Sequence, residues 1–284
     1  MSSFSFENRA GIAQRYPDVF RTDWWQRGRI AILVGGTVGL FLFGIVQLDI
    51  PFNRLSLGMV RLGEFVQLML PPNPGSWAEV LKYLHALGET VSIAFLGTLG
   101  GALLALPVSL LAARNVVANR IIRLLTRRGL DTIRGVDTLI WALIWVGVVG
   151  LGPFAGILAV ICSDFGTFGK LFSEAIEVAE KNPAEGVRSS GGNHLHSVRF
   201  GLLPQVFPVL LSQVLYYFES NTRSATIIGI VGAGGIGLQL AEQIRVLEWQ
   251  KVSFLILLIL VTVSSIDWIS GKLRFAIIGK RTVA

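Results

Sequence analysis

Three polar residues stand close together inside an otherwise apolar stretch of the sequence. Glu219, Asn221 and Arg223 lie within residues 200–231, a stretch long enough to cross a membrane as a helix. Glu219 and Arg223 are four positions apart, so on a helix they share one face and can form an ion pair, whereas Asn221 points elsewhere. Ionisable groups at membrane depth usually mark a transport pathway or a contact with a partner protomer. A structural ion pair between two helices is the alternative interpretation.

A glycine-rich run follows this stretch. It reads Gly232-Ala233-Gly234-Gly235-Ile236-Gly237 and matches the letters of a dinucleotide-binding fingerprint. That fingerprint requires a soluble βαβ unit, whereas the next segment here is apolar and long enough to span a membrane. We therefore expect a bent, closely packed backbone at the outer membrane face. Gly232, Gly234, Gly235 and Gly237 would line a gate or pore, or form a plain turn into a short surface helix.

Residue types that catalyse reactions or bind metals are scarce. His85, His194 and His196 fall in expected loops without acidic or cysteine partners at metal-ligand spacing, so we expect no metal site. No histidine lies in an apolar run, which disfavours an intramembrane Ser/His hydrolase. Cys162 is interpreted as a small buried residue. The sequence has no Gly-x-x-x-x-Gly-Lys-Ser/Thr loop, so we expect no ATP hydrolysis and no cofactor on this chain.

The composition indicates a membrane protein. Of 284 residues, 52% are hydrophobic and 15% charged, against about a quarter charged in soluble domains. In a soluble protein, the net charge of +7 would suggest binding to nucleic acid. Here the cations lie in short clusters between apolar runs, as they do in cytoplasmic loops of membrane proteins. We therefore expect a lipid membrane, and no nucleic acid, as partner. The clusters contain Arg9, Arg15, Arg21, Arg27 and Arg29; Arg114, Arg120, Arg123, Arg127, Arg128 and Arg134; and Lys272, Arg274, Lys280 and Arg281.

The apolar stretches predict an all-α membrane protein with about six transmembrane helices and both termini in the cytoplasm. The predicted spans are 30–48, 91–113, a hairpin within 138–163, 200–231 and 252–270. The predicted organisation is a cytoplasmic N-terminal segment (1–29), a first transmembrane helix with an external loop (30–89), a transmembrane core (90–274) with a cytoplasmic loop (180–204), and a cytoplasmic tail (275–284).

The stretch 138–163 has a strong break in its middle. Gly150-Leu151-Gly152-Pro153 is typical of a turn, and the apolar segments beside it are each about half a span long. We therefore expect a tight hairpin rather than one long tilted helix. Its two helices must extend through polar residues, which brings Asp137 and Asp164 near or into the membrane.

Two motifs resemble those of ABC-importer permeases. Glu185-Gly186-Val187, then Gly191 and, after nine residues, Gly201-Leu202-Leu203-Pro204 are similar in spacing to the cytoplasmic coupling loop of that family. The family pattern has alanines where Gly186 and Val187 stand and an isoleucine at the position of Gly201. The resemblance implies that the loop 180–204 docks onto an ATPase through Glu185, Gly186, Val187, Gly191, Leu203 and Pro204.

The second motif is similar to the end of permeases that import phosphonates, with methionine-importer permeases as more distant relatives. It comprises residues 218–225, which contain Glu219, Asn221 and Arg223, and the glycine-rich run 231–237. The resemblance covers about residues 90–274. It implies a type I permease fold in the bacterial inner membrane, a homodimer, two ATP-binding cassette subunits that carry ATP and Mg²⁺, an extracytoplasmic binding protein, and phosphonate, phosphite or a related phosphorus oxyanion as cargo.

Two other classes of protein explain part of the sequence. An ion-coupled secondary transporter would carry protons on Asp137, Asp164 and Asp267. Inverted repeats would support that class, and the sequence shows none. A purely structural membrane subunit would explain the spans but leaves the spacing of the coupling-loop motif to coincidence.

Overall fold

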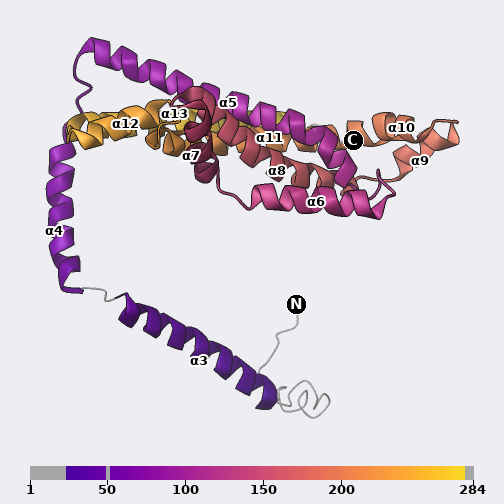
Figure 1. Ribbon diagram of the computed structural model, residues 1–284, viewed down its shortest axis with the longest axis horizontal. Coiled ribbons are helices and arrows are strands. Elements are labelled where there is room, and N and C mark those ends of the chain that lie inside the picture. The colour runs from indigo at the N-terminus through magenta and orange to yellow at the C-terminus, as the bar shows by residue number, and fades with distance from the viewer. Residues whose placement is uncertain (1–23, 49–51, 279–284) are drawn as a thin grey trace, which may run out of the picture. The chain divides into compact units, whose positions relative to one another are not determined.

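Helices form all the regular structure of residues 24–48 and 52–278, which the computed structural model describes (Figure 1). The chain divides into two compact units, one up to Phe65 and one from Val66 onward. The predicted all-α fold is confirmed. In chain order the helices are α3 (Trp24–Gln47), α4 (Phe52–Met69), α5 (Trp77–Ala112), α6 (Arg120–Arg134), α7 (Thr138–Val149), α8 (Pro153–Val178), α9 (Asn182–Ser189), α10 (His194–His196), the π-helix η2 (Ser197–Leu202), α11 (Leu203–Ile230), α12 (Ile236–Arg245) and α13 (Trp249–Ile278).

Five helices among the described residues are long and apolar enough to cross a membrane. They are α3 over Arg27–Gln47, α5, α8, the continuous helix His194–Ile230, and α13 up to Ile277. The pair α6 and α7 gives a sixth if it counts as one span bent by 83°. This agrees with the predicted number of about six. The side of the membrane on which the termini lie stays a prediction, since residues 1–23 and 279–284 lie outside the described residues.

The first unit is built on α3. This helix begins six residues before the predicted first span, 30–48, and ends one residue before its end. Its apolar side chains are exposed in the isolated chain, as a helix surrounded by lipid requires. The segment predicted as an external loop contains α4 and the first turns of α5. Its position outside the membrane stays a prediction.

In the second unit, α5 and α8 pack along each other through small residues. A Cβ atom at Gly97 would lie 2.5 Å from the Cβ of Val160, and one at Gly101 would lie 2.7 Å from the Cβ of Asp164. Because lipid gives helices little hydrophobic reason to associate, close backbone approach and dispersion contacts hold such pairs together. The large buried side chains Phe168 and Phe172 of α8 fill the space toward α11, with their rings stacked at 5.0 Å.

The N-terminal end of α5 is fixed by polar contacts. Ser76 and Glu79 form a capping box that satisfies free backbone N–H groups at the start of the helix. Lys251 of α13 donates to the other oxygen of Glu79 at 2.6 Å. This explains why α5 begins at Trp77, fourteen residues before the apolar run that predicts it: the helix continues beyond the apolar part because a cap and an ion pair stabilise its polar end.

The arginine-rich segment predicted as a loop is the amphipathic helix α6. Its Leu130 is buried against Gly169 of α8, where a Cβ would overlap the leucine side chain. Lys170 of α8 donates to Asp131 at 2.8 Å. The polar face of α6 keeps most of its cations exposed, so the positive charge that indicates a cytoplasmic position is compatible with a helix lying against the transmembrane core.

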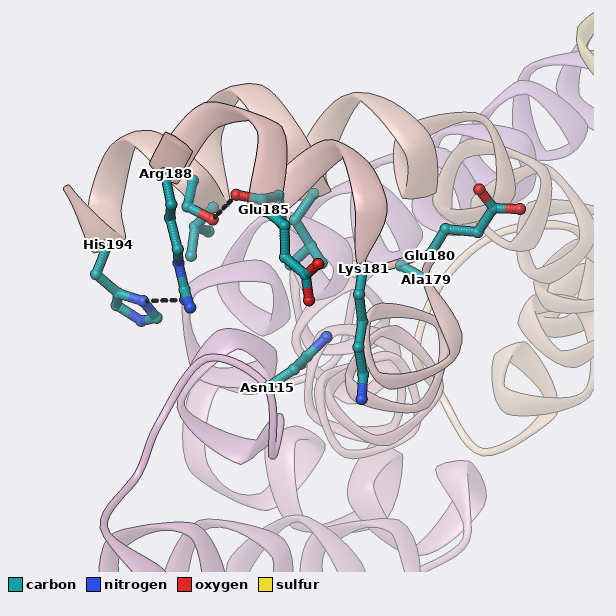
Figure 2. Close-up of a pocket in the computed structure, with 11 residues that line it drawn as sticks. Asn115, Ala179, Glu180, Lys181, Glu185, Arg188 and His194 are labelled. Atoms are coloured by element: carbon teal, nitrogen blue, oxygen red, sulfur yellow. Dashed lines mark hydrogen bonds between the residues drawn. The ribbon is translucent and has the colours of Figure 1, made fainter. Parts of the chain in front are cut away.

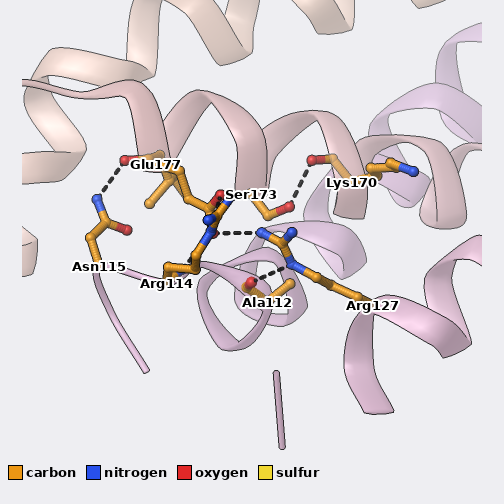
Figure 3. A network of polar contacts seen from close by, with 8 residues as sticks. Ala112, Arg114, Asn115, Arg127, Lys170, Ser173 and Glu177 are labelled. Carbon is orange, nitrogen blue, oxygen red and sulfur yellow. Dashed lines mark hydrogen bonds and ion pairs between the residues drawn. The ribbon is translucent and has the colours of Figure 1, made fainter. Parts of the chain in front are cut away.

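Glu177, near the end of α8, joins three elements through one carboxylate (Figure 3). It accepts from the backbone N–H of Arg114 at 2.6 Å, from Nε of Arg114 at 3.2 Å and from Arg127 Nη2 at 2.5 Å. Nε of Arg127 also donates to the carbonyl of Ala112 at 3.0 Å. The ends of α5 and α8 are thereby fixed to α6.

The predicted hairpin is present. α7 ends at Val149 and α8 begins at Pro153, with Gly150 and Gly152 at φ +91° and +135° between them. Pro153 stands at the start of α8, where a missing N–H costs no hydrogen bond. The 12 residues of α7 span about 18 Å, which is less than the ~30 Å thickness of the hydrocarbon core of a membrane. α7 can therefore cross a membrane only together with α6, as one bent span.

Replacement of Gly97 by leucine should weaken the contact between α5 and α8. The new side chain would overlap Val160, and overpacking of this kind costs about 1–3 kcal/mol. Gly88→Leu is the matched control, since the same helix has no atom within 4 Å of a Cβ built at Gly88. Thermal denaturation of the purified protein in detergent should show a lower midpoint for Gly97→Leu only. Equal midpoints for both variants would contradict the close packing of α5 on α8.

Candidate functional site

A buried polar cluster lies where α5, α8 and α11 meet. Asn221 Nδ2 donates to Asp164 Oδ2 at 2.6 Å and to Thr98 Oγ1 at 2.8 Å. Asp164, Asn221 and Thr98 are 2%, 6% and 1% exposed. The structure thus places Asn221 in the interhelical core, on a different side of α11 from Glu219 and Arg223. Its assignment to a transport pathway stays a prediction, while its role in joining the three helices follows from the contacts.

Glu219 forms ion pairs with two arginines, one at each carboxylate oxygen. Arg223 Nη1 lies 3.4 Å from Oε1, the pair predicted from the spacing of four residues, and Arg274 Nη2 lies 3.1 Å from Oε2. The side chain of Glu219 is 8% exposed, that of Arg274 is 23% exposed and that of Arg223 is 51% exposed. The sequence does not single out Arg274, because this residue lies in a basic cluster after the expected end of the last span. In the structure α13 continues through it to Ile278.

The glycine-rich run is a turn that several elements contact. Gly232, Gly234 and Gly235 all have positive φ, between +73° and +98°, a region that side chains disfavour. The backbone N–H of Gly235 donates to Glu89 at 3.2 Å, and the N–H of Ile236 donates to Thr90 at 2.8 Å. The geometry confirms a turn into the short helix α12.

Close backbone contacts explain the remaining glycines of this run. The N–H of Gly152 donates to the carbonyl of Gly232 at 3.0 Å, and a Cβ at Gly234 would lie 2.7 Å from the nitrogen of Pro153. A Cβ at Gly237 would overlap the carbonyl of Thr226 on α11. The run therefore packs against the α7–α8 turn and against α11. Whether it gates a pathway stays a prediction.

The segment that resembles a coupling loop forms a short helix held against a longer one. In α9, Glu185 and Gly186 are exposed, while Ala184 faces η2. Ser197 Oγ donates to the carbonyl of Ala184 at 3.0 Å, and a Cβ at Gly201 would lie 2.6 Å from the Cα of Ala184. The family pattern has an isoleucine at position 201. Here glycine permits the closer approach of α9.

Gly191 separates α9 from the following helix. Its φ is +87° and no atom lies within 4 Å of a Cβ built on it. The N–H of the next residue, Gly192, donates to the carbonyl of Val187 at 3.0 Å, which closes the end of α9. The chain therefore turns at Gly191 in open space.

η2 makes room for Pro204 within one continuous helix. The N–H of Leu203 donates to the carbonyl of Val198, a bond across five residues instead of four. Such wider turns relieve the steric conflict that a proline ring creates in a helix. The side chain of Gln205 donates to the carbonyl of Gly201 at 2.5 Å. Leu203 and Pro204 thus stand at the start of α11 and not at the exposed surface of α9.

A cavity of about 200 Å³ lies beneath α9 (Figure 2). Arg188 donates to Nδ1 of His194 at 3.1 Å, and Nε2 of His194 lies 2.8 Å from the carbonyl of Val116. This arrangement fits a neutral imidazole that donates from Nε2 and accepts at Nδ1. The imidazole connects the segment that resembles a coupling loop to the loop between α5 and α6. Lys181, Glu185 and Asn115 also line the cavity.

The three acids that a proton-coupled transporter would use have other partners or positions. Asp137 caps α7 by accepting from the N–H of Leu139 at 2.8 Å. Asp164 belongs to the buried cluster with Asn221, and Asp267 is 60% exposed beside Arg274. No group of three or more His, Cys, Asp or Glu that could hold a metal occurs within residues 24–48 and 52–278.

The helices, the projecting α9 and the polar residues at membrane depth define a membrane transport subunit. Residues 105–276 match the family described as binding-protein-dependent transport system inner membrane component. The chain belongs to this family, the inner-membrane permeases of ABC importers. The assignment supports the ABC-importer interpretation over an ion-coupled secondary transporter.

Individual relatives agree with this assignment. HtxC of Stutzerimonas stutzeri, provisionally named as a phosphite transport permease, is 39% identical over 230 residues, which are 81% of this chain and 80% of that protein. PtxC of the same organism, named as a phosphite transport system permease protein, is 33% identical over 256 residues, 90% of this chain and 91% of PtxC. The MetNI methionine ABC transporter, solved in an inward-facing conformation, has the same fold, with a TM-score of 0.63 at 20% identity over 72% of this chain and 99% of that one.

Enlargement of Gly201 should loosen α9. A leucine would overlap Ala184, so α9 must move away from η2. Trypsin should then cleave after Arg188 about ten times faster in detergent-solubilised protein, because local opening governs proteolysis. The control is Gly186→Ala, whose methyl group meets open space and favours the helix, and which should not accelerate cleavage. An unchanged rate in Gly201→Leu would contradict the close approach at this position.

Proposed function

We propose that this chain is the permease subunit of an ABC importer for phosphorus oxyanions such as phosphonate or phosphite. HtxC and PtxC are named for phosphite transport, and other relatives have names that refer to phosphate import and phosphonate transport. The proposed complex contains two copies of this chain, two ATP-binding cassette subunits and an extracytoplasmic binding protein. ATP and Mg²⁺ bind to the partner subunits, and this chain supplies the membrane pathway and catalyses no reaction.

The observation that carries the proposal is the direct attachment of α9 to the helix that bears the membrane polar residues. α9 contacts η2 through Ala184, Ser197 and Gly201, and η2 continues into α11 as one helix that ends at Ile230. Glu219, Asn221 and Arg223 all lie on that helix. If an ATPase displaces α9, the movement is therefore transmitted along one helix to Glu219, Asn221 and Arg223.

The same displacement reaches α5 and α8. His194 binds the carbonyl of Val116 after α5, and Asn115 donates to the carbonyl of Ile176 on α8 at 2.6 Å. Glu177 then ties both helices to α6. We infer that closure of the ATPases moves these helices together between inward-facing and outward-facing states, as packed elements with two discrete arrangements do.

Reconstitution tests the substrate class. The chain is placed in liposomes with its ATPase and binding protein, and uptake of labelled phosphite and a labelled alkylphosphonate is measured in competition. Uptake should require ATP and all three components, and one oxyanion should compete better than the other. Uptake driven by a proton gradient without the ATPase, or no uptake of any phosphorus oxyanion while another solute is imported, would disprove the proposal.

Gly191→Trp should uncouple ATP hydrolysis from import. The positive φ at this residue and the open space around it mean that tryptophan both strains the turn and projects from the proposed docking face. We expect import to fall by about tenfold or more, as expected for loss of roughly 1.4 kcal/mol of coupling. Gly191→Asn is the matched control, because asparagine tolerates positive φ and is small. Normal coupling in Gly191→Trp would count against docking at this turn.

A further inference from the structure

We propose that Arg223 and Arg274 form a transit site for the transported oxyanion, and that the Glu219 carboxylate occupies this site when no anion is present. The inference rests on the proposed function, since it assumes a phosphorus oxyanion as cargo. It adds a residue, Arg274 on α13, and assigns Glu219 the role of an internal competitor.

The geometry places two guanidinium groups around one carboxylate. Arg223 reaches Oε1 of Glu219 at 3.4 Å and Arg274 reaches Oε2 at 3.1 Å, from two different helices. Planar guanidinium groups bind carboxylate and phosphate oxygens with the same donor pattern. A tetrahedral oxyanion therefore can take the place of the carboxylate between the same donors.

Arg274 is oriented unusually for a cation close to a helix end. Long basic side chains at such positions normally extend toward the aqueous interface. Arg274, four residues before Ile278, instead directs its guanidinium to the buried Glu219 on α11 and lies over the ring of Tyr216 at 5.8 Å. Its Nη1 atom is buried and has no hydrogen-bond partner among the described residues. This atom is a donor available to a further acceptor.

Two acids lie near the two arginines, and only one of these acids is buried. Among the three groups that meet in the site, Arg223 and Arg274 carry two positive charges against one negative charge on Glu219, and a second, exposed acid beside them brings the total to zero. The other acid within ion-pair distance in the described part of the chain is Asp267, 4.0 Å from Arg274 and 60% exposed. The side chain of Arg223 is 51% exposed, so α11 and α13 do not enclose it.

Competition with Glu219 keeps the site weak. Conduction requires that an anion bind well enough to enter and weakly enough to leave. A carboxylate that returns to the two guanidinium groups displaces the anion, and it also keeps both arginines paired at membrane depth between transport events. A site made of two unopposed arginines would retain the oxyanion.

The alternative is an ion pair that only joins α11 to α13. The two interpretations predict different results when both charges of the buried pair are removed together. Glu219→Gln combined with Arg274→Gln removes both charges of the buried pair and leaves only the half-exposed Arg223 without a carboxylate, so a purely structural pair between α11 and α13 is replaced without loss of transport. A transit site loses half of its donors by the same change.

The experiment compares the double variant Glu219→Gln/Arg274→Gln, the single variants Arg223→Gln and Glu219→Gln, and the control Lys272→Gln in the reconstituted complex. Lys272 lies on the same helix over the ring of Trp268 at 3.8 Å, away from Glu219. The measurements are ATP-dependent uptake of labelled phosphite, ATP hydrolysis stimulated by loaded binding protein, and retention of labelled phosphite by the solubilised permease–ATPase complex without binding protein.

The transit site predicts a specific pattern. Uptake falls about tenfold or more in the double variant and in Arg223→Gln, as expected for the loss of one charge-assisted hydrogen bond. Stimulated ATP hydrolysis in these variants stays near the wild-type rate, and uptake by Lys272→Gln stays near the wild-type level. Glu219→Gln retains more phosphite than the wild type, because the competing carboxylate is gone.

Three results overturn the inference. These are wild-type uptake by the double variant, wild-type uptake by Arg223→Gln, or a parallel loss of ATP hydrolysis and uptake that shows a structural role. If the wild-type complex imports no phosphorus oxyanion, the proposed function fails as well. If it imports phosphite and the variants do so equally, only the inference fails.

Discussion

Polar groups buried between helices at membrane depth are the constraint on which the arrangement of this permease depends. A side chain such as Asp164 cannot face hydrocarbon, and a half-made polar contact there is worse than an apolar one. Asn221 and Thr98 satisfy it from two other helices. The cluster therefore sets which faces of α5, α8 and α11 meet, and the glycines beside it allow the backbones to come close enough for these short bonds.

The two polar faces of α11 differ in what they contact. Asn221 is held by α5 and α8 in the core, whereas Glu219 and Arg223 face α13 and a more exposed surface. The N-terminal end of the same helix continues through η2 to the contacts with α9. A π-turn shifts the helix register and commonly occurs at functional sites. It lies between the segment that would receive the ATPase movement and the residues that would respond to it.

The sequence predicts the features that follow from local chemistry. The apolar runs predict the helices, the four-residue spacing of Glu219 and Arg223 predicts their pair, and Gly150-Leu151-Gly152-Pro153 predicts the hairpin turn. It does not predict contacts between distant segments. Arg274 lies 55 residues from Glu219, and nothing near it in the sequence indicates that α13 extends past residue 270. The sequence also does not predict that the segment of α6 is a helix packed on α8. Its arginines indicate only a cytoplasmic position.

The pairing of Glu219 also bears on how a channel for anions can contain arginines at all. An unopposed arginine at membrane depth is costly to bury and binds oxyanions firmly, so it disfavours both folding and release. A neighbouring carboxylate makes the arginine less costly to bury and makes the anion easier to release, provided that the carboxylate lies on an element that moves relative to the second arginine. Glu219 and Arg223 share α11, whereas Arg274 belongs to α13. Relative motion of these two helices would change the contact between Glu219 and Arg274, whereas the contact between Glu219 and Arg223 would move with α11. The affinity of the proposed site for an anion would then depend on the conformation of the permease.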